Sequence, residues 1–211
     1  MESVSTLQEG SDFMSPTSSS RSARKDAQYN RAQILDAASR AFASQGVDAS
    51  MDAIAKDAGV GAGTLYRHFP NKDALLAALL DAHYQTLETK RQLIASEDIE
   101  ADQMLDRWID ALGDWMLVYN GLPEPLRAAW SEVRSPLSPT CRQAIETTDQ
   151  FLNKAKREGR ARQDLTGHEI FLAALAIAWA SGASTADGST RSALRNLLKL
   201  GWTTGKDQQR S

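Results

Sequence analysis

The stretch from Ser50 to Lys72 reads SMDAIAKDAGVGAGTLYRHFPNK, and its pattern predicts two short helices joined by a tight turn. Ser50 is a preferred N-cap residue, and Gly59 favours the left-handed conformation that commonly ends a helix. Each helix has an apolar edge at helical spacing, made of Ile54, Ala55 and Ala58 in the first and of Leu65 and Phe69 in the second. The two helices can therefore share one small core.

The opposite face of the second helix has a different composition. It is small, hydroxylated or cationic, with the residues Ala62, Gly63, Thr64, Tyr66, Arg67 and His68, followed by Lys72. Such a face can enter the major groove of DNA, because small residues permit close approach and the Arg67 guanidinium can fork onto a guanine edge. The pattern predicts a helix-turn-helix motif over residues 50–69.

The run from Ala32 to Leu80, and above all TLYRHFPNK at Thr64 to Lys72, closely resembles the DNA-binding domain of the tetracycline-repressor (TetR) family of bacterial transcription regulators. The resemblance implies that the DNA backbone is held by Ser50, Thr64, Tyr66, His68 and Lys72. It implies that base edges are faced by Ala62, Gly63, Thr64 and Arg67. It also implies that a ligand in the helical body moves the connecting helix, which begins at Asn71, and changes the separation of two recognition helices.

Composition places the chain among ordinary globular proteins. Of its 211 residues 42% are hydrophobic and 24% charged, and the net charge is −3. Residues 21–92 are weakly basic, with ten bases and eight acids, which is compatible with phosphate contact. Cys141 is the single cysteine, and no cysteine and histidine spacing resembles a zinc site, so we expect no metal and no cofactor. We expect a cytoplasmic protein, because no window suits a membrane span or a signal peptide.

The helical periodicity continues to the end of the chain and predicts an all-α fold of about nine helices. We expect a disordered, Ser- and Thr-rich tail over residues 1–26, a helix-turn-helix domain over residues 29–88, and a helical effector-binding and dimerisation domain over residues 89–211. The first helix is expected from about residue 27 to residue 45. The bases that end the tail either reach the DNA minor groove or are merely solvated.

The body is rich in aromatic and methionine side chains, which either fill its core or line an apolar effector pocket. The candidate pocket residues are Met104, Trp108, Leu112, Trp115, Met116, Trp130, Phe151 and Trp179. An alanine-rich helix from residue 170 and a leucine-rich last helix suit a four-helix interface with a second copy of the chain. The candidate interface residues are Ile170, Ala174, Ile177, Leu194, Leu197 and Leu198.

Aspartates recur every four residues, at Asp98, Asp102, Asp106, Asp110 and Asp114. The row is interpreted as a solvated face near Arg107, with an acidic lining for a cationic ligand as the alternative. Cys141 is interpreted as a small buried residue, with an oxidant-sensing thiol as the alternative.

The predicted function is a homodimeric, sequence-specific repressor of transcription that binds double-stranded operator DNA. It is released by a small effector, apolar or cationic, and it is not an enzyme. Two rivals remain: an enzyme that uses the aspartate row or Cys141, and a DNA-binding module that responds to no ligand.

Overall fold

The structure, a computed structural model, describes residues 17–132, 134–182 and 188–204. Within these ranges the chain forms nine helices, so the predicted all-helical fold is confirmed. Their bounds are α1 Thr17–Gln45, α2 Met51–Asp57, α3 Ala62–His68, α4 Lys72–Ser96, α5 Ala101–Met116, α6 Pro123–Ser131, α7 Ser138–Arg157, α8 Gly167–Ser181 and α9 Gly188–Trp202. None of the described helices combines the length and the apolar character that crossing a membrane requires.

The first helix begins ten residues earlier than predicted. Residues 17–26 belong to α1, so the prediction that they are disordered is wrong, while residues 1–16 of the predicted tail lie outside the described residues. The cause is cooperative helix growth: once a helix is anchored, each added residue gains a hydrogen bond for little further cost. The anchor is the buried stripe of Ile34, Ala38 and Phe42, whereas the side chains of residues 21–29 are exposed.

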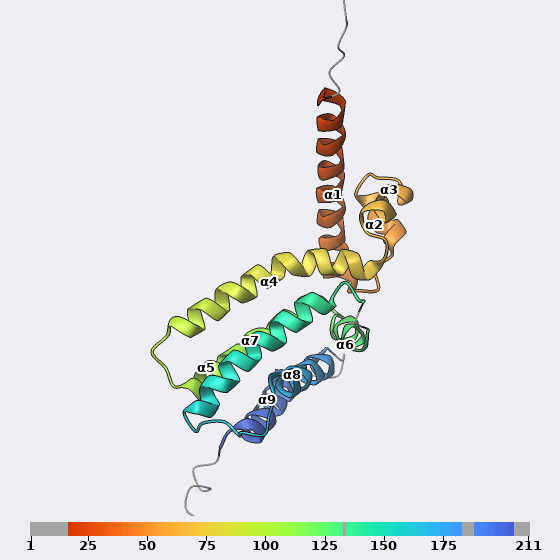
Figure 1. The fold of residues 1–211 in the computed structure, drawn as a ribbon. Coiled ribbons are helices and arrows are strands. Elements are labelled where there is room, and N and C mark those ends of the chain that lie inside the picture. The colour runs from red at the N-terminus through yellow and green to blue at the C-terminus, as the bar shows by residue number, and fades with distance from the viewer. Residues whose placement is uncertain (1–16, 133, 183–187, 205–211) are drawn as a thin grey trace, which may run out of the picture.

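The helices α1, α2 and α3 form a small unit on the first turns of α4, at one end of the molecule (Figure 1). Asn71 caps α4 as predicted, because its side chain accepts a hydrogen bond of 2.8 Å from the backbone N–H of Ala74. From that cap α4 runs without interruption into the body, where it packs on α5 and α7. The expected domain boundary at residues 88 and 89 therefore falls inside one continuous helix that belongs to both units.

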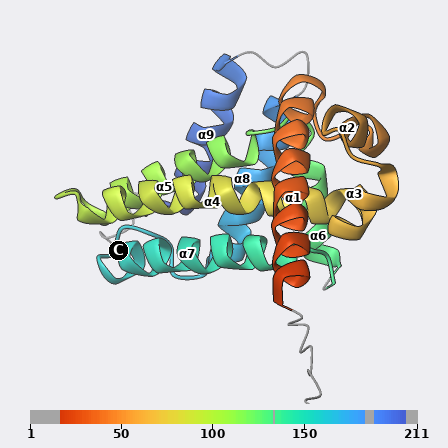
Figure 2. The same ribbon diagram turned by 90° about the horizontal axis from the view of Figure 1, so that it is seen from above.

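The body is built around α5, which packs against α4, α7 and α8 (Figure 2). Trp108 on α5 is fully buried, stacks on Phe151 of α7 at 5.5 Å between ring centroids, and donates its indole N–H to Thr148 Oγ1 at 2.9 Å. The predicted capping box at the start of α8 is confirmed by reciprocal hydrogen bonds between Thr166 and Glu169. The contacts of Trp108 fix α7 on the central helix, and the capping box fixes the start of α8.

Candidate nucleic-acid interface and ligand site

Local sequence signals produce the α2–turn–α3 unit directly. Ser50 Oγ accepts a hydrogen bond from the Ala53 backbone N–H, at 3.5 Å, and so caps α2. Gly59 has a φ of 67°, which only glycine adopts without strain, and it lets the chain turn into α3. Four residues of the apolar edges, Ile54, Ala55, Leu65 and Phe69, are buried as predicted, and Ala58 is half-buried. The turn therefore holds α3 at a fixed angle to α2.

The outer face of α3 is open. Ala62, Gly63, Tyr66 and Arg67 are exposed, and Tyr66 keeps 45% of its surface accessible. A Cβ atom added at Gly63 would meet no atom within 4 Å. The helix carries no acidic residue, and its last turn carries Arg67 and His68. The outer face therefore has small side chains near the start of α3 and basic side chains near its end. This pattern is typical of a helix that enters a DNA groove.

Arg67 is folded along its own helix. Its Nε donates to the carbonyl oxygen of Gly63 at 3.2 Å, and its Nη2 donates to Thr64 Oγ1 at 2.9 Å. Neither partner is a carboxylate, so the guanidinium charge is not neutralised by these contacts. The side chain can exchange two weak, exposed hydrogen bonds for a base edge or a phosphate.

The remaining predicted backbone contacts flank the outer face of α3. His68 and Lys72 are half-buried, at the end of α3 and the start of α4, and Ser50 is exposed at the start of α2. Arg31 of α1 lies over the Phe69 ring, 5.3 Å from its centroid, and so ties α1 to the end of α3. The predicted residues thus lie on α3 and at the adjoining helix starts, and their contacts with DNA stay a prediction.

The eight residues predicted to line an effector pocket do not form one group. Trp130 and Trp179 are exposed, by 47% and 66%, on α6 and α8. The other six are buried in the body: Met104, Trp108, Leu112, Trp115, Met116 and Phe151. For these six the core interpretation accounts for their packing, and their role in binding an effector stays a prediction.

Two members of this set, Trp179 and Trp115, border pockets in the body. Trp179 borders a groove of about 410 Å³ between α6 and α8, where Arg127 and Glu124 form an ion pair of 2.6 Å at the rim. Trp115 borders a smaller cavity between α4 and α5. The α4 wall of that cavity was missed by the sequence interpretation, although His83, Thr86, Leu87 and Lys90 recur at i, i+3, i+4 and i+7, which marks one face of a helix.

The aspartate row forms ion pairs between two helices, although part of it stays exposed to solvent. Three of its members on α5 form ion pairs with three cations on α9: Asp114 with Arg191 at 2.7 Å, Asp110 with Arg195 at 2.5 Å, and Asp106 with Arg195 at 3.0 Å and Lys199 at 2.7 Å. The cations also stand four residues apart, so the two rows match along the helices. Asp110 and Asp114 stay more than half exposed, as a solvated face predicts, whereas Asp106 is half-buried. Cations of the same chain occupy the place that the alternative interpretation gave to a cationic ligand.

The predicted interface residues fall into two groups. Ile170 and Ala174 are each only 2% exposed, because they pack inside the chain, so they are not available to a second copy. Ile177, Leu194 and Leu198 are half-buried, and Leu197 is 65% exposed. Two residues that were not predicted for the interface, Trp179 and Leu200, are also exposed. An apolar surface thus remains uncovered on α8 and α9.

Cys141 is buried at 1% exposure on α7, and burial raises the pKa of its thiol to about 11. A thiol in that state is almost entirely protonated at neutral pH and is a poor nucleophile. The interpretation of Cys141 as a small buried residue is confirmed, and the oxidant-sensing alternative is disfavoured.

Comparison with known proteins agrees with this geometry at both ends of the chain. Residues 34–79 match the family described as "Bacterial regulatory proteins, tetR family", and residues 100–201 match "Transcriptional regulator SbtR-like, C-terminal domain". The chain belongs to the TetR family. The first match covers the buried stripe of α1, the helix-turn-helix and the start of α4, and the second covers α5 to α9 of this TetR-family protein.

Individual relatives resemble part of the chain. The TetR-family chain is 44% identical over 79 residues to the HTH-type transcriptional regulator TtgR of Pseudomonas putida, which is 37% of this chain and 38% of that protein. It is 40% identical over 80 residues to an HTH-type transcriptional regulator of Staphylococcus aureus, which is 37% of this chain and 43% of that protein. The chain thus spans about two fifths of the length of these curated relatives.

Solved structures resemble most of the TetR-family chain. A TetR transcriptional regulator of Streptomyces coelicolor is 29% identical, with a TM-score of 0.53 over 83% of this chain and 99% of that chain. The regulator FadR of Bacillus subtilis, solved in complex with stearoyl-CoA, is 22% identical, with a TM-score of 0.57 over 80% of this chain and 97% of that chain. At that identity the second likeness shows the fold alone.

Proposed function

We propose that this protein is a homodimeric, sequence-specific repressor of transcription that binds double-stranded operator DNA through α3. The single observation that carries the proposal is the open outer face of α3, which bears no acidic residue and exposes Tyr66 and Arg67. Gly63 lets this face approach a duplex closely, because no side chain stands there. Operator release then follows from a small molecule bound in the body, and the protein acts by binding DNA rather than by catalysis, in the cytoplasm.

The dimer places two such faces on one duplex. A two-fold pair formed through the uncovered apolar surface of α8 and α9 sets two recognition helices about 34 Å apart, one turn of DNA. Trp179, Leu197 and Leu200 support this interface, since large apolar side chains exposed together on a monomer commonly mark an association surface. The effector acts by favouring the dimer shape that does not fit the operator, so operator DNA weakens effector binding by the same factor.

The test is DNA binding by the full chain, measured by fluorescence anisotropy on the DNA upstream of its own coding region. The double variant Tyr66→Ala with Lys72→Ala removes an exposed aromatic ring and a cation beside it, and we expect at least a tenfold loss of affinity, about 1.4 kcal/mol. Arg157→Ala, at the end of α7, is the control and leaves affinity unchanged. Unchanged affinity in the double variant, with circular dichroism showing it folded, would exclude this face.

A further inference from the structure

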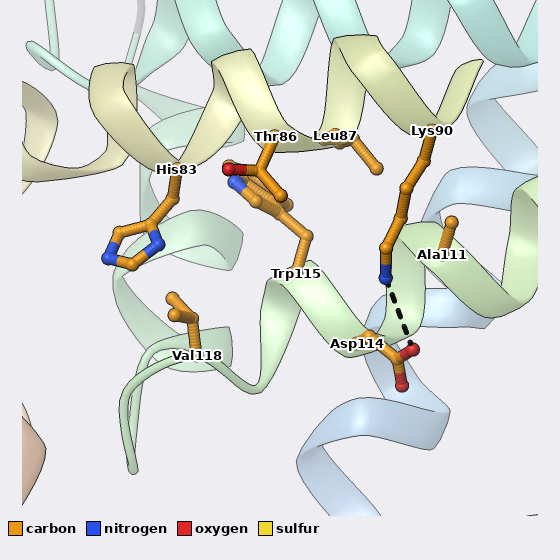
Figure 3. A pocket seen from close by; sticks show the side chains of 8 residues that line it. All are labelled: His83, Thr86, Leu87, Lys90, Ala111, Asp114, Trp115 and Val118. Carbon is orange, nitrogen blue, oxygen red and sulfur yellow. Dashed lines mark ion pairs between the residues drawn. The ribbon is translucent and has the colours of Figure 1, made fainter. Parts of the chain in front are cut away.

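The cavity between α4 and α5 has the size of a single ring. Its volume is about 150 Å³, and an apolar cavity of about that size can hold a benzene molecule. Figure 3 shows the side chains that line it. Leu87 of α4, Ala111 of α5 and Val118 just after α5 supply apolar walls. The remaining lining groups are polar, so the cavity suits a ring that carries polar substituents.

One of the polar groups is a buried donor without a partner. Trp115 is 5% exposed, and its indole Nε1 is buried without a hydrogen-bond partner among the described residues. The edge-to-face contact with Tyr84, at 6.2 Å between centroids, holds the indole ring in place. An indole N–H can only donate, and a buried donor left unpaired is unfavourable. Trp115 also lines the cavity, so its indole brings an unsatisfied donor to the cavity wall.

A second polar group is a loosely held cation. Lys90 Nζ lies 3.8 Å from Asp114 Oδ2, the dashed contact in Figure 3, whereas the Arg191 guanidinium lies 2.7 Å from the other oxygen of the same carboxylate. Asp114 thus keeps a close cationic partner if Lys90 moves away. Lys90 and Asp114 both line the cavity, so the ammonium can bind a ligand anion when its contact with Asp114 breaks.

The opposite side of the cavity holds neutral hydrogen-bonding groups. In Figure 3 His83 lies on the side away from Lys90, with Thr86 and Trp115 between them. The Nε2 atom of His83 is 3.0 Å from the Tyr119 hydroxyl, which fixes the ring and leaves its other nitrogen for a ligand. Burial lowers the pKa of His83 and so favours the neutral ring. This side suits an uncharged hydroxyl group.

We propose that the cavity binds a hydroxylated aromatic acid of one ring, with its carboxylate on Lys90 and its hydroxyl toward Trp115 and His83. The ligand would replace the Lys90–Asp114 contact between α4 and α5, and α4 carries the DNA-binding unit at its other end. The effect of this ligand on DNA binding rests on the proposed function, whereas the binding of the ligand to the cavity does not. Under that function the aromatic acid is the effector.

The test uses para-hydroxybenzoate as the probe and the full chain labelled with ¹⁵N. We expect saturable binding by titration calorimetry and a shift of one indole N–H resonance, assigned to Trp115 by its loss in Trp115→Phe. Lys90→Met weakens binding at least tenfold, since it removes the anion partner and keeps the side-chain length. The control Lys56→Met, on α2, leaves binding unchanged. The neutral analogue para-hydroxybenzamide binds at least tenfold more weakly than the acid.

Ala111→Val provides a second, independent test. It fills the cavity without removing a polar group, and we expect it to abolish binding of the acid. No binding at millimolar probe, or equal binding by the wild type, Lys90→Met and Ala111→Val, overturns the proposal. Fluorescence anisotropy with operator DNA distinguishes a failure of this proposal from a failure of the proposed function. If the acid binds but the affinity for DNA is unchanged, the ligand site is supported and its regulatory role is excluded. If the protein binds DNA but not the acid, only the ligand site is overturned.

Discussion

The backbone N–H of Val47 donates a hydrogen bond of 2.9 Å to the carbonyl oxygen of Asn120. This contact joins the loop after α1, in the DNA-binding unit, to the turn before α6, in the body. The loops can approach this closely because each has a glycine at the contact. A Cβ atom on Gly46 would lie 2.7 Å from the Asn120 oxygen, and one on Gly121 would lie 2.9 Å from Val47 Cγ2. The two units are therefore joined beside α4 as well as through it.

Replacing either of these glycines is expected to destabilise the protein. Gly46 and Gly121 have φ values of 74° and 80°, and a left-handed residue with a side chain costs about 1–2 kcal/mol before any steric clash. We expect Gly46→Ala and Gly121→Ala to lose at least that much free energy of unfolding in urea. Gly63→Ala is the matched control, since its Cβ meets nothing and alanine favours a helix by up to about 1 kcal/mol. If Gly46→Ala unfolded at the same urea concentration as the wild type, the close contact would be contradicted.

Signals carried by neighbouring residues allowed the helices to be predicted from the sequence. Ser50, Asn71 and Thr166 each cap the helix that follows, because a short polar side chain next to an apolar run satisfies the free N–H groups of the first turn. The start of α1 could not be predicted because residues 17–26 carry no such local signal. The buried residues that anchor the helix begin only at Ile34.

Contacts between distant residues could not be predicted in this way. Arg195 meets Asp110 across 85 positions of sequence, and each row alone looks like a solvated charged face. Their shared spacing of four was visible, but nothing local shows that α9 lies on α5. The cavity of Trp115 and Lys90 has the same origin, since its two walls come from helices whose pairing is a property of the tertiary fold.

Arg195 is expected to be the main electrostatic link between α5 and α9. Its side chain is only 11% exposed and bonds to Asp106 and Asp110, so Arg195→Ala leaves a partly buried carboxylate short of a partner. We expect a loss of about 2 kcal/mol in unfolding free energy, measured in urea at low salt. Arg127→Ala removes an exposed pair of the same type on α6, and its loss is expected to stay below about 1 kcal/mol. Equal losses in the two variants would show that the link is no stronger than a surface pair.

Cys141 is expected to react slowly and to make stability fall at alkaline pH. Because burial raises its pKa from 9.0 to about 11, the unfolded chain loses the thiol proton first as pH rises. The stability from the neutral thiol is complete below pH 9 and is lost as pH rises to about 11. We expect slow alkylation by iodoacetamide at pH 8 that becomes fast in urea. Over pH 9–11 the unfolding free energy of the wild type falls more than that of Cys141→Ala, and parallel curves would contradict the raised pKa.

Charges placed on the uncovered apolar surface are expected to separate the dimer. Leu197 and Leu200 are 65% and 75% exposed on α9, so the double change to aspartate leaves the packing within one chain intact. We expect monomers by light scattering and weaker operator binding, since each half-site then binds alone. Leu93→Asp, at a 60% exposed position on α4, is the control and stays dimeric. A double variant that remains a dimer would place the interface elsewhere on the molecule.

Arg67 and Lys72 are expected to contribute to DNA binding in different ways. Arg67 lies on the open face of α3 and can reach a base edge, so Arg67→Ala costs about 1–3 kcal/mol on the operator but little on unrelated DNA. Lys72 lies at the start of α4 beside that face, and we expect it to hold a phosphate. Lys72→Ala then weakens binding to all sequences alike and lowers the slope of log affinity against log salt by about 1. Anisotropy titrations on operator and scrambled DNA at several salt concentrations measure both effects. An equal loss on both duplexes for Arg67→Ala would move that residue from the bases to the backbone.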